Sequence, residues 1–258
     1  MSIRRIVPLD QARWSVAPPP AWRLPRDVDW TFRAPTEEAV AWLLLDEQHD
    51  VASQAVTRRW VRQLLSIAAV QALAQVELEF EPDSQCLVVH ELVIWRLEAD
   101  GAWRKRTPVV AEAFLLRQRE QQLEQQMLNG RVSLVALLED VRIGDVVDLA
   151  WTVEPRERLP GLAFTTYFAF AWRSPLAQAF FTLHLADEAP VRWTLHPGGD
   201  GPLPEQREAA GLVEWSLRAP PRFEGEDNVP GSHWHWPLLE VSGWDSWQAV
   251  ARCVSELW

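Results

Sequence analysis

Short runs in which apolar and polar residues alternate recur along this chain, and they constrain its fold more than any other feature. Apolar side chains occupy every second position in residues 75–80, and residues 147–153 repeat the pattern. A period of two is that of a β-strand, whose successive side chains point to opposite faces of a sheet. Turn residues such as Asp100-Gly101 separate these runs. About ten such strands predict a mainly β chain, folded as an antiparallel β-sandwich.

One internal segment departs from the strand pattern. Residues 112–129 are dominated by good helix formers, and Asn129-Gly130 would end a helix there. We expect this segment to be a solvated surface helix. Residues 57–73 fit either one helix or a strand followed by a helical turn, and spacing alone does not decide between them.

The N-terminal region is rich in proline and tryptophan. Consecutive prolines at 18–20 favour an extended, polyproline-like path. The region is either an arm laid over the domain or a solvated linker, and the second alternative would leave Trp14, Trp22 and Trp30 exposed. We therefore divide the chain into an extended arm (1–36), a β-sandwich domain (37–240) and an exit helix (241–258).

The C-terminal segment predicts an amphipathic helix. It begins near Ser246, with Asp245 or Ser246 as the N-cap. Its apolar face and the nearby loop tryptophans are the candidate interaction residues. They are Trp234, Trp236, Trp244, Trp247, Val250, Val254 and Leu257.

Composition excludes several classes of protein. The 258 residues carry 25 Lys and Arg against 36 Asp and Glu, and the resulting net charge of −11 argues against a nucleic-acid-binding face. Two cysteines, Cys86 and Cys253, are too few for a disulfide framework or a thiolate zinc site. No apolar run approaches the ~20 residues of a membrane span, and no apolar stretch of a secretory signal follows Met1. We expect a cytoplasmic protein without a membrane segment.

His233 and His235 form the most suggestive local arrangement for chemistry. Alternate residues of a strand point to one face, and neutral imidazole is a common transition-metal ligand. A metal site would need a third ligand, for which His196, Asp227 and Glu240 are available. Prolines on both sides make strand geometry doubtful, so loop histidines packed on tryptophans are the favoured interpretation. We expect no metal and no other cofactor.

Several stretches occur in an order that carries a family resemblance. The clearest are NGR at 129–131 and LEDVRIGDVVD at 138–148. The others are AWLLLDEQ at 41–48, VELEFEP at 76–82, CLVVH at 86–90 and VSGWDSWQAV at 241–250. Together they resemble a bacterial domain of unknown function that lies immediately N-terminal to transglutaminase-like cysteine catalytic domains.

The resemblance covers roughly residues 37–258 and implies a β-sandwich with a non-catalytic role. In such proteins the Cys, His and Asp of a papain-like triad lie in the downstream domain. No catalytic residue is carried over to this chain, and we expect that it is not an enzyme. We expect this chain to depart from the family in two ways, by having no export signal of the kind found in many envelope-associated relatives and by having Cys253 where an aromatic is common.

Three functions follow from these observations. The leading hypothesis is an accessory module that packs on, or presents substrate to, a transglutaminase- or protease-like domain. A second is a standalone β-sandwich that binds carbohydrate or peptide on exposed tryptophans, which combine apolar area with a polar edge. The third, a metal-dependent enzyme built on His233 and His235, is the least favoured.

Overall fold

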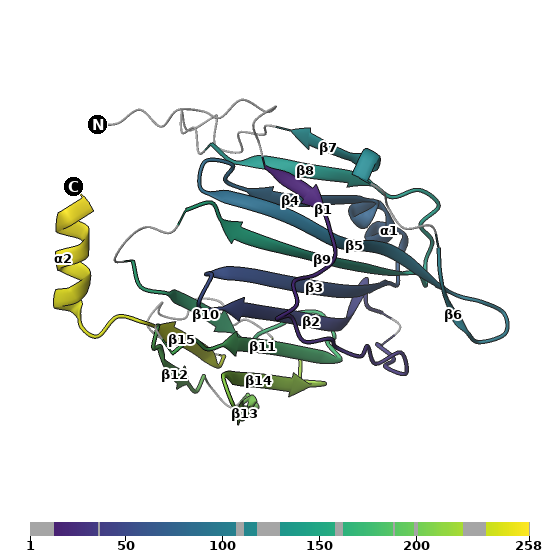
Figure 1. The fold of residues 1–258 in the computed structure, drawn as a ribbon. Helices are drawn as coiled ribbons and strands as arrows, with labels where there is room; N and C mark the ends of the chain where they lie inside the picture. Colours follow the sequence, from purple (N-terminus) through teal and green to yellow (C-terminus); the bar gives the residue numbers. More distant parts are fainter. Residues whose placement is uncertain are drawn as a thin grey trace, which may run out of the picture.

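The computed structural model describes residues 13–35, 37–106, 111–117, 130–157, 162–187, 189–198, 201–223 and 236–257. Within these ranges the chain is mainly β, as the alternation predicts, with fifteen strands and two α-helices (Figure 1). The strands form one large sheet and two smaller ones.

The large sheet has the order β1-β5-β9-β3-β2-β11-β14-β13, and β6 extends it as a hairpin partner of β5. Its strands are β1 (Trp14–Val16), β2 (Val40–Asp50), β3 (Ala55–Leu64), β5 (Gln85–Leu97), β6 (Trp103–Lys105), β9 (Val146–Pro155), β11 (Gln178–His184), β13 (Glu205–Ala209) and β14 (Leu212–Arg218). The expected Asp100-Gly101 turn joins β5 to β6, and Gly101 takes the positive φ of 81° that such a turn favours.

Each smaller sheet has three strands. The first, in the order β4-β8-β7, contains β4 (Gln75–Phe80), β7 (Phe114–Arg117) and β8 (Val132–Leu137). The second, in the order β10-β15-β12, contains β10 (Thr165–Ala169), β12 (Arg192–His196) and β15 (Leu238–Ser242). The helices are α1 (Ile67–Leu73) and α2 (Trp247–Leu257), and a short 3₁₀ turn covers Ala111–Ala113.

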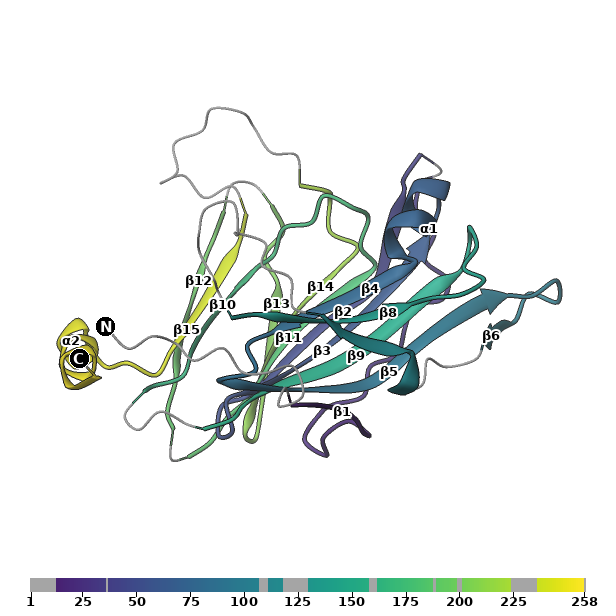
Figure 2. The same cartoon turned by 90° about the horizontal axis from the view of Figure 1, so that it is seen from above.

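Both smaller sheets pack on the same face of the large sheet. One row of paired residues crosses four neighbouring strands of this sheet, and paired residues place their side chains on the same face. The row consists of Phe181 on β11, Glu47 on β2, Arg58 on β3 and Trp151 on β9. At one end of the row, Trp151 belongs to the core under the first small sheet. At the other end, Phe181 belongs to the core under the second, which forms a separate layer beside β11 and β14 (Figure 2). The result is a sandwich with two cores side by side.

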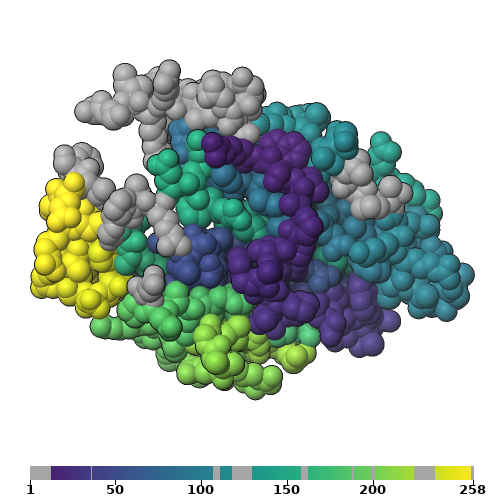
Figure 3. Space-filling view, viewed as in Figure 1, coloured from purple at the N-terminus to yellow at the C-terminus, as the bar shows by residue number. Residues whose placement is uncertain are grey.

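The opposite face of the large sheet is covered by the N-terminal arm. Val28, Trp30 and Phe32 of the arm pack against Leu44 of β2 and Val61 of β3. The arm crosses the front of the molecule in Figure 3, where it is coloured purple. The sequence left open whether this region is an arm laid over the domain or a solvated linker. The described part lies on the domain, so it is an arm.

The strand pairing differs from a purely antiparallel sandwich. The pairs β1/β5 and β2/β11 are parallel, while the other pairs in the three sheets are antiparallel. Each parallel pair joins segments that are far apart in the sequence, and the local alternation carries no signal of strand direction.

The prediction of a helix over residues 112–129 is wrong for residues 114–117. Residues Phe114–Arg117 form β7, and residues 118–129 lie outside the described ranges. Phe114 is buried in the first core and Leu115 is exposed, which is the period of a strand. Pairing with β8 and burial of Phe114 override the local helix propensity.

Residues 57–73, which by sequence fit either one helix or a strand followed by a helical turn, form a strand followed by a helix. Strand β3 ends at Leu64, and α1 begins at Ile67 with Ser66 as its N-cap. The Ser66 hydroxyl oxygen accepts a hydrogen bond of 3.1 Å from the Ala69 amide. At the C-terminus, β15 reaches Ser242, so the segment 241–258 starts in a strand and is helical from Trp247.

Candidate functional site

Among the expected interaction residues whose side chains the structure describes, those of the C-terminal helix α2 are the most exposed. Trp247 is 84% exposed and Val254 is 49% exposed, while Val250 is half-buried. A hydrogen bond of 3.2 Å from the Ala249 amide to the Ser246 hydroxyl caps the helix start, as expected. Figures 1 and 2 show α2 at the margin of the molecule, beyond β15. This apolar face, formed by Trp247, Val250 and Val254, is called the α2 face below.

The other expected interaction residues do not join the α2 face. Trp236 precedes β15 and packs edge-on against Phe223 at a ring-centroid distance of 4.8 Å. Trp244 follows β15 and is half-buried, and its amide donates to the Ser242 hydroxyl at 3.1 Å. Trp234 lies outside the described residues, as does the side chain of Leu257.

The expected histidine pair cannot be placed, because His233 and His235 lie outside the described residues. Of their potential third ligands, His196 and Glu240 contact each other on neighbouring strands, with His196 Nε2 2.8 Å from Glu240 Oε2. In the described ranges, no cluster of three or more His, Cys, Asp or Glu side chains has the arrangement of a metal site.

No helix in the described part of the chain has the length and apolar character required to span a membrane.

A buried polar layer, which sequence reasoning missed, joins the arm to the large sheet. Arg26 of the arm pairs with Asp46 of β2 at 3.3 Å and with Glu214 of β14, and it donates to the Thr182 hydroxyl of β11 at 2.9 Å. Its guanidinium also lies 4.3 Å from the ring centroid of Phe180. Burial raises the pKa of Asp46, and the positive charge of Arg26 opposes that rise.

A second ion pair continues this layer. Arg59 of β3 donates to both carboxylate oxygens of Asp148 on β9, at 2.9 and 2.7 Å. The same guanidinium donates to the backbone oxygen of Arg26 at 3.0 Å, and the indole of Trp95 donates to Asp148 at 3.2 Å. The bidentate geometry is the strongest form of a guanidinium–carboxylate pair.

Gln48 of β2 holds the arm through its backbone. Its side-chain oxygen accepts from the Leu24 amide and its nitrogen donates to the Leu24 oxygen, both at 2.8 Å. The sequence carries only a weak signal for this layer, because Asp46 and Gln48 belong to the polar run DEQHD at 46–50 that follows the apolar residues 41–45. The hydrogen bonds and ion pairs of this layer fasten the arm to the large sheet.

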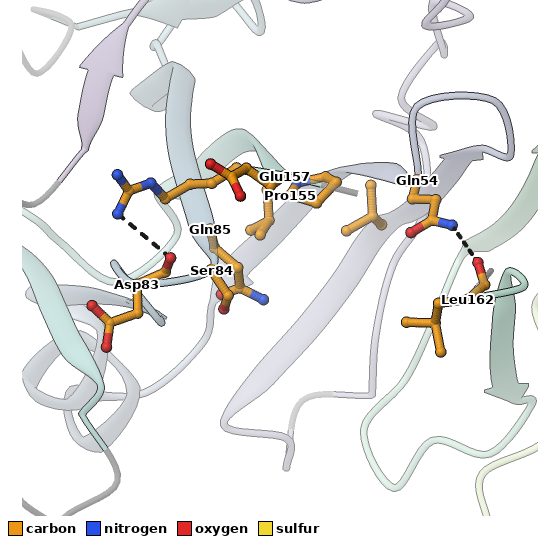
Figure 4. Close-up of a pocket in the computed structure, with 10 residues that line it drawn as sticks. Gln54, Asp83, Ser84, Gln85, Pro155, Glu157 and Leu162 are labelled. Atoms are coloured by element: carbon orange, nitrogen blue, oxygen red, sulfur yellow. Dashed lines mark hydrogen bonds between the residues drawn. The ribbon is translucent and has the colours of Figure 1, made fainter. Parts of the chain in front are cut away.

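An open hollow of about 510 Å³ lies at one end of β3, β5 and β9. Its lining residues are Gln54, Val56, Asp83, Ser84, Gln85, Val153, Pro155, Arg156, Glu157 and Leu162. Figure 4 shows Asp83, Ser84 and Gln85 on one side, with Gln54 and Leu162 on the other.

Two polar side chains of this hollow, Arg156 and Gln54, bond to backbone oxygens. Arg156 donates to the carbonyl oxygens of Pro82 at 2.9 Å and Asp83 at 3.4 Å, and Gln54 donates to that of Leu162 at 3.3 Å. Asp83 and Glu157 are exposed to solvent. The hollow therefore brings together no buried acid–base pair, and its residues stabilise the loops around it.

Together, these features define a β-sandwich module that is covered by its own arm and exposes an apolar terminal helix. Residues 51–224 match the DUF3857 family, a domain of unknown function with a solved structure. The match covers more than half of the chain, and the chain belongs to this family.

Solved structures show a similar fold. One is the crystal structure of a predicted protease from Parabacteroides distasonis ATCC 8503, with a TM-score of 0.64 and 17% sequence identity. The similarity covers 84% of this chain and 43% of that one, so this chain spans less than half of its length. Another is Legionella pneumophila aminopeptidase A in complex with aspartic acid, with a TM-score of 0.34, 9% identity, and coverage of 81% and 22%, respectively. That second similarity is too low to carry an argument. No curated protein matches the chain.

Proposed function

We propose that this chain is a non-catalytic accessory domain that packs, through the α2 face, on a transglutaminase- or protease-like domain and presents substrate to it. The observation that carries the proposal is the exposure of Trp247 and Val254 on one side of a capped helix.

The physics of an isolated helix supports a docking role. Helices shorter than about 12–15 residues are marginal in water unless an apolar face packs against something. Helix α2 has 11 residues, and Trp247 is its most exposed apolar side chain. Burying such an aromatic side chain contributes about 1.5–3 kcal/mol, and tryptophan is enriched where interfaces are strongest.

The similarity to the predicted protease adds a second line of support. In that protein a domain with this fold makes up less than half of a longer chain. The remaining part of such a chain is a natural partner for an exposed terminal helix. The transglutaminase-like character of the partner comes from the sequence resemblance described above.

Direct reconstitution tests the proposal. First, the DNA downstream of codon 258 and the neighbouring genes are searched for a domain that contains a Cys, His and Asp triad. That domain is then co-expressed with this chain. We expect a stoichiometric complex that is lost in the Trp247→Glu, Val254→Glu variant. The matched control is Ile143→Glu, which changes another exposed apolar residue, 55% exposed in a loop, and should leave the complex intact.

Two further measurements make the result decisive. The double variant should melt like the wild-type chain, because exposed positions contribute little to stability. The chain alone should neither cleave casein nor couple an amine to it. The proposal fails if no such domain is encoded nearby, if the complex survives the double variant, or if the chain alone is active.

The binding of carbohydrate or peptide on exposed tryptophans has less support. Of the fourteen tryptophans that the structure describes, only Trp247 is exposed, and the others are buried or half-buried. A stacking platform needs several accessible rings on one surface, and the described tryptophans do not provide it.

A further inference from the structure

We propose that Arg62, together with the indoles of Trp42 and Trp60, forms a binding site for a carboxylate group. The inference is independent of the proposed function, because these residues lie on the large sheet and not on α2.

The three side chains are brought together by strand register. Arg62 on β3 lies directly opposite Trp42 on β2, and Trp60 lies two residues before Arg62 on the same face. The guanidinium carbon of Arg62 is 5.3 Å from the ring centroid of Trp42 and 5.6 Å from that of Trp60. The ring centroids of the two indoles lie 5.5 Å apart in an edge-to-face contact, and Trp60 also packs edge to face against Trp151 at 4.7 Å.

Arg62 has no anionic partner in the described part of the chain, a property that it shares with Arg23 of the arm, whose Nε is also buried without a hydrogen-bond partner. Arg26, Arg59 and Arg96 each pair with at least one carboxylate. In the described part of the chain, Arg62 makes no ion pair, and its Nε is buried without a hydrogen-bond partner. Burial lowers the pKa of Arg62 to about 10. Burying a guanidinium nitrogen that has no hydrogen-bond partner opposes folding, so the position of Arg62 needs an explanation other than stability.

The site lies between the two cores. On the same face, Val147 and Leu149 of β9 are buried under the first small sheet, and Phe181 of β11 is buried under the second. Strands β2 and β3 run between these regions. There Trp42, Trp60 and Arg62 are only half-buried, so a ligand can reach them.

The chemistry selects a carboxylate. A guanidinium presents a planar pair of N–H donors that matches the two oxygens of a carboxylate, and it keeps this geometry while stacked on aromatic rings. The indoles offer apolar surface to the carbon atoms that bear the carboxylate. The net charge of −11 disfavours a polyanion such as a nucleic acid. The carboxylate belongs either to a small free acid or to the C-terminus of a peptide.

The test follows the tryptophan indole N–H resonances of the full chain by NMR, with Trp42→Phe and Trp60→Phe variants to assign two of them. The probes are succinate and acetyl-dialanine with a free C-terminus, each with its amide as the neutral control. We expect saturable shifts of the Trp42 and Trp60 signals with at least one acid and none with the amides. The acid that binds identifies the source of the carboxylate.

Variants of Arg62 separate recognition from structure. Arg62→Met should abolish the shifts, and Arg62→Lys should weaken binding by about tenfold, because an ammonium group lacks the planar fork. Arg104→Met, which changes an exposed arginine paired with Asp100, should bind like the wild-type chain.

Thermal unfolding shows whether Arg62 serves to bind a ligand or to stabilise the fold. Without ligand, the Arg62→Met variant should melt at the same temperature as the wild-type chain or higher. The acid that binds should raise the melting temperature of the wild-type chain but not that of the Arg62→Met variant. The proposal is overturned if neither acid produces a saturable shift, if the amides act like the acids, or if Arg62→Met still binds. It is also overturned if Arg62→Met is less stable and the acids do not stabilise the wild-type chain.

Discussion

At the scale of single residues, Glu47 shows how the large sheet keeps a charge between its two cores. One carboxylate oxygen lies 2.7 Å from Nε2 of His49, and the other accepts a hydrogen bond of 2.6 Å from Nε of Arg58. Burial acts to raise the pKa of Glu47, but the hydrogen bond from His49 and the charge of Arg58 together outweigh it. The pKa falls to about 2.

This lowered pKa predicts a specific loss of stability in acid. The unfolded chain binds a proton at Glu47 near its ordinary pKa of 4.5, whereas the folded chain does so only at about 2. The contribution to stability is therefore complete above about pH 4.5 and is lost as the pH falls towards 2. Its size is at most about 3–4 kcal/mol, from about 1.4 kcal/mol for each pKa unit.

Urea unfolding across this pH range measures the effect. The Glu47→Gln variant should lose this part of the pH dependence, while Glu154→Gln, at an exposed position, should keep the wild-type slope. An unchanged slope in Glu47→Gln would show that the ion pairs of Glu47 do not stabilise the fold.

At the scale of elements, the arm is fastened at several points along its length. Strand β1 pairs with β5, Leu24 exchanges two hydrogen bonds with Gln48, and Trp30 packs on Trp95 and Trp103 with ring-centroid distances of 5.1 Å each. Because these contacts are spread over the arm, we expect it to open as one unit rather than to fray freely.

The Trp30→Ala substitution tests this coupling. It removes a half-buried indole, with an expected loss of about 2 kcal/mol from the closed state of the arm. Local opening should then become about thirtyfold more frequent. Hydrogen exchange of peptides that contain the Leu24 amide should accelerate accordingly, and Trp247→Ala should leave it unchanged. Protection that persists in Trp30→Ala would mean that the ion pairs of Arg26 hold the arm alone.

Elements differ in how well the sequence predicts them. Helix α2 follows from its own apolar spacing and from Ser246, since both signals are local. Strand β7 does not, because its helix-forming residues are drawn into a sheet by β8 and by burial of Phe114. The α2 face was therefore predictable, whereas strand β7 was not.

At the scale of the whole molecule, aromatic side chains connect the layers. Trp215 and Phe181 lie in the second core, Trp151 lies in the first, and Trp30 joins the arm to the large sheet. Since nearly all of the described tryptophans are shielded, the folded chain should emit blue-shifted tryptophan fluorescence that acrylamide quenches poorly.

Unfolding in urea is the internal reference for this measurement, because it exposes every indole. We expect a clear red shift of the emission and a large increase in quenching on unfolding. Emission from the folded chain that is already as red and as quenchable as that of the unfolded chain would restore the case for a tryptophan binding platform.

The sequence by itself determined the mainly β class, most strand positions and the apolar face of the terminal helix. These properties depend on the period of nearby residues, which is local information. Only the tertiary structure decided that the arm covers one face of the large sheet and that two small sheets cover the other. It also decided which charges are paired. Arg26 forms an ion pair with Glu214, which lies 188 positions away in the sequence, whereas Arg62 packs against two indoles instead of a carboxylate. Such partners are set by strand order and register, which no local pattern contains.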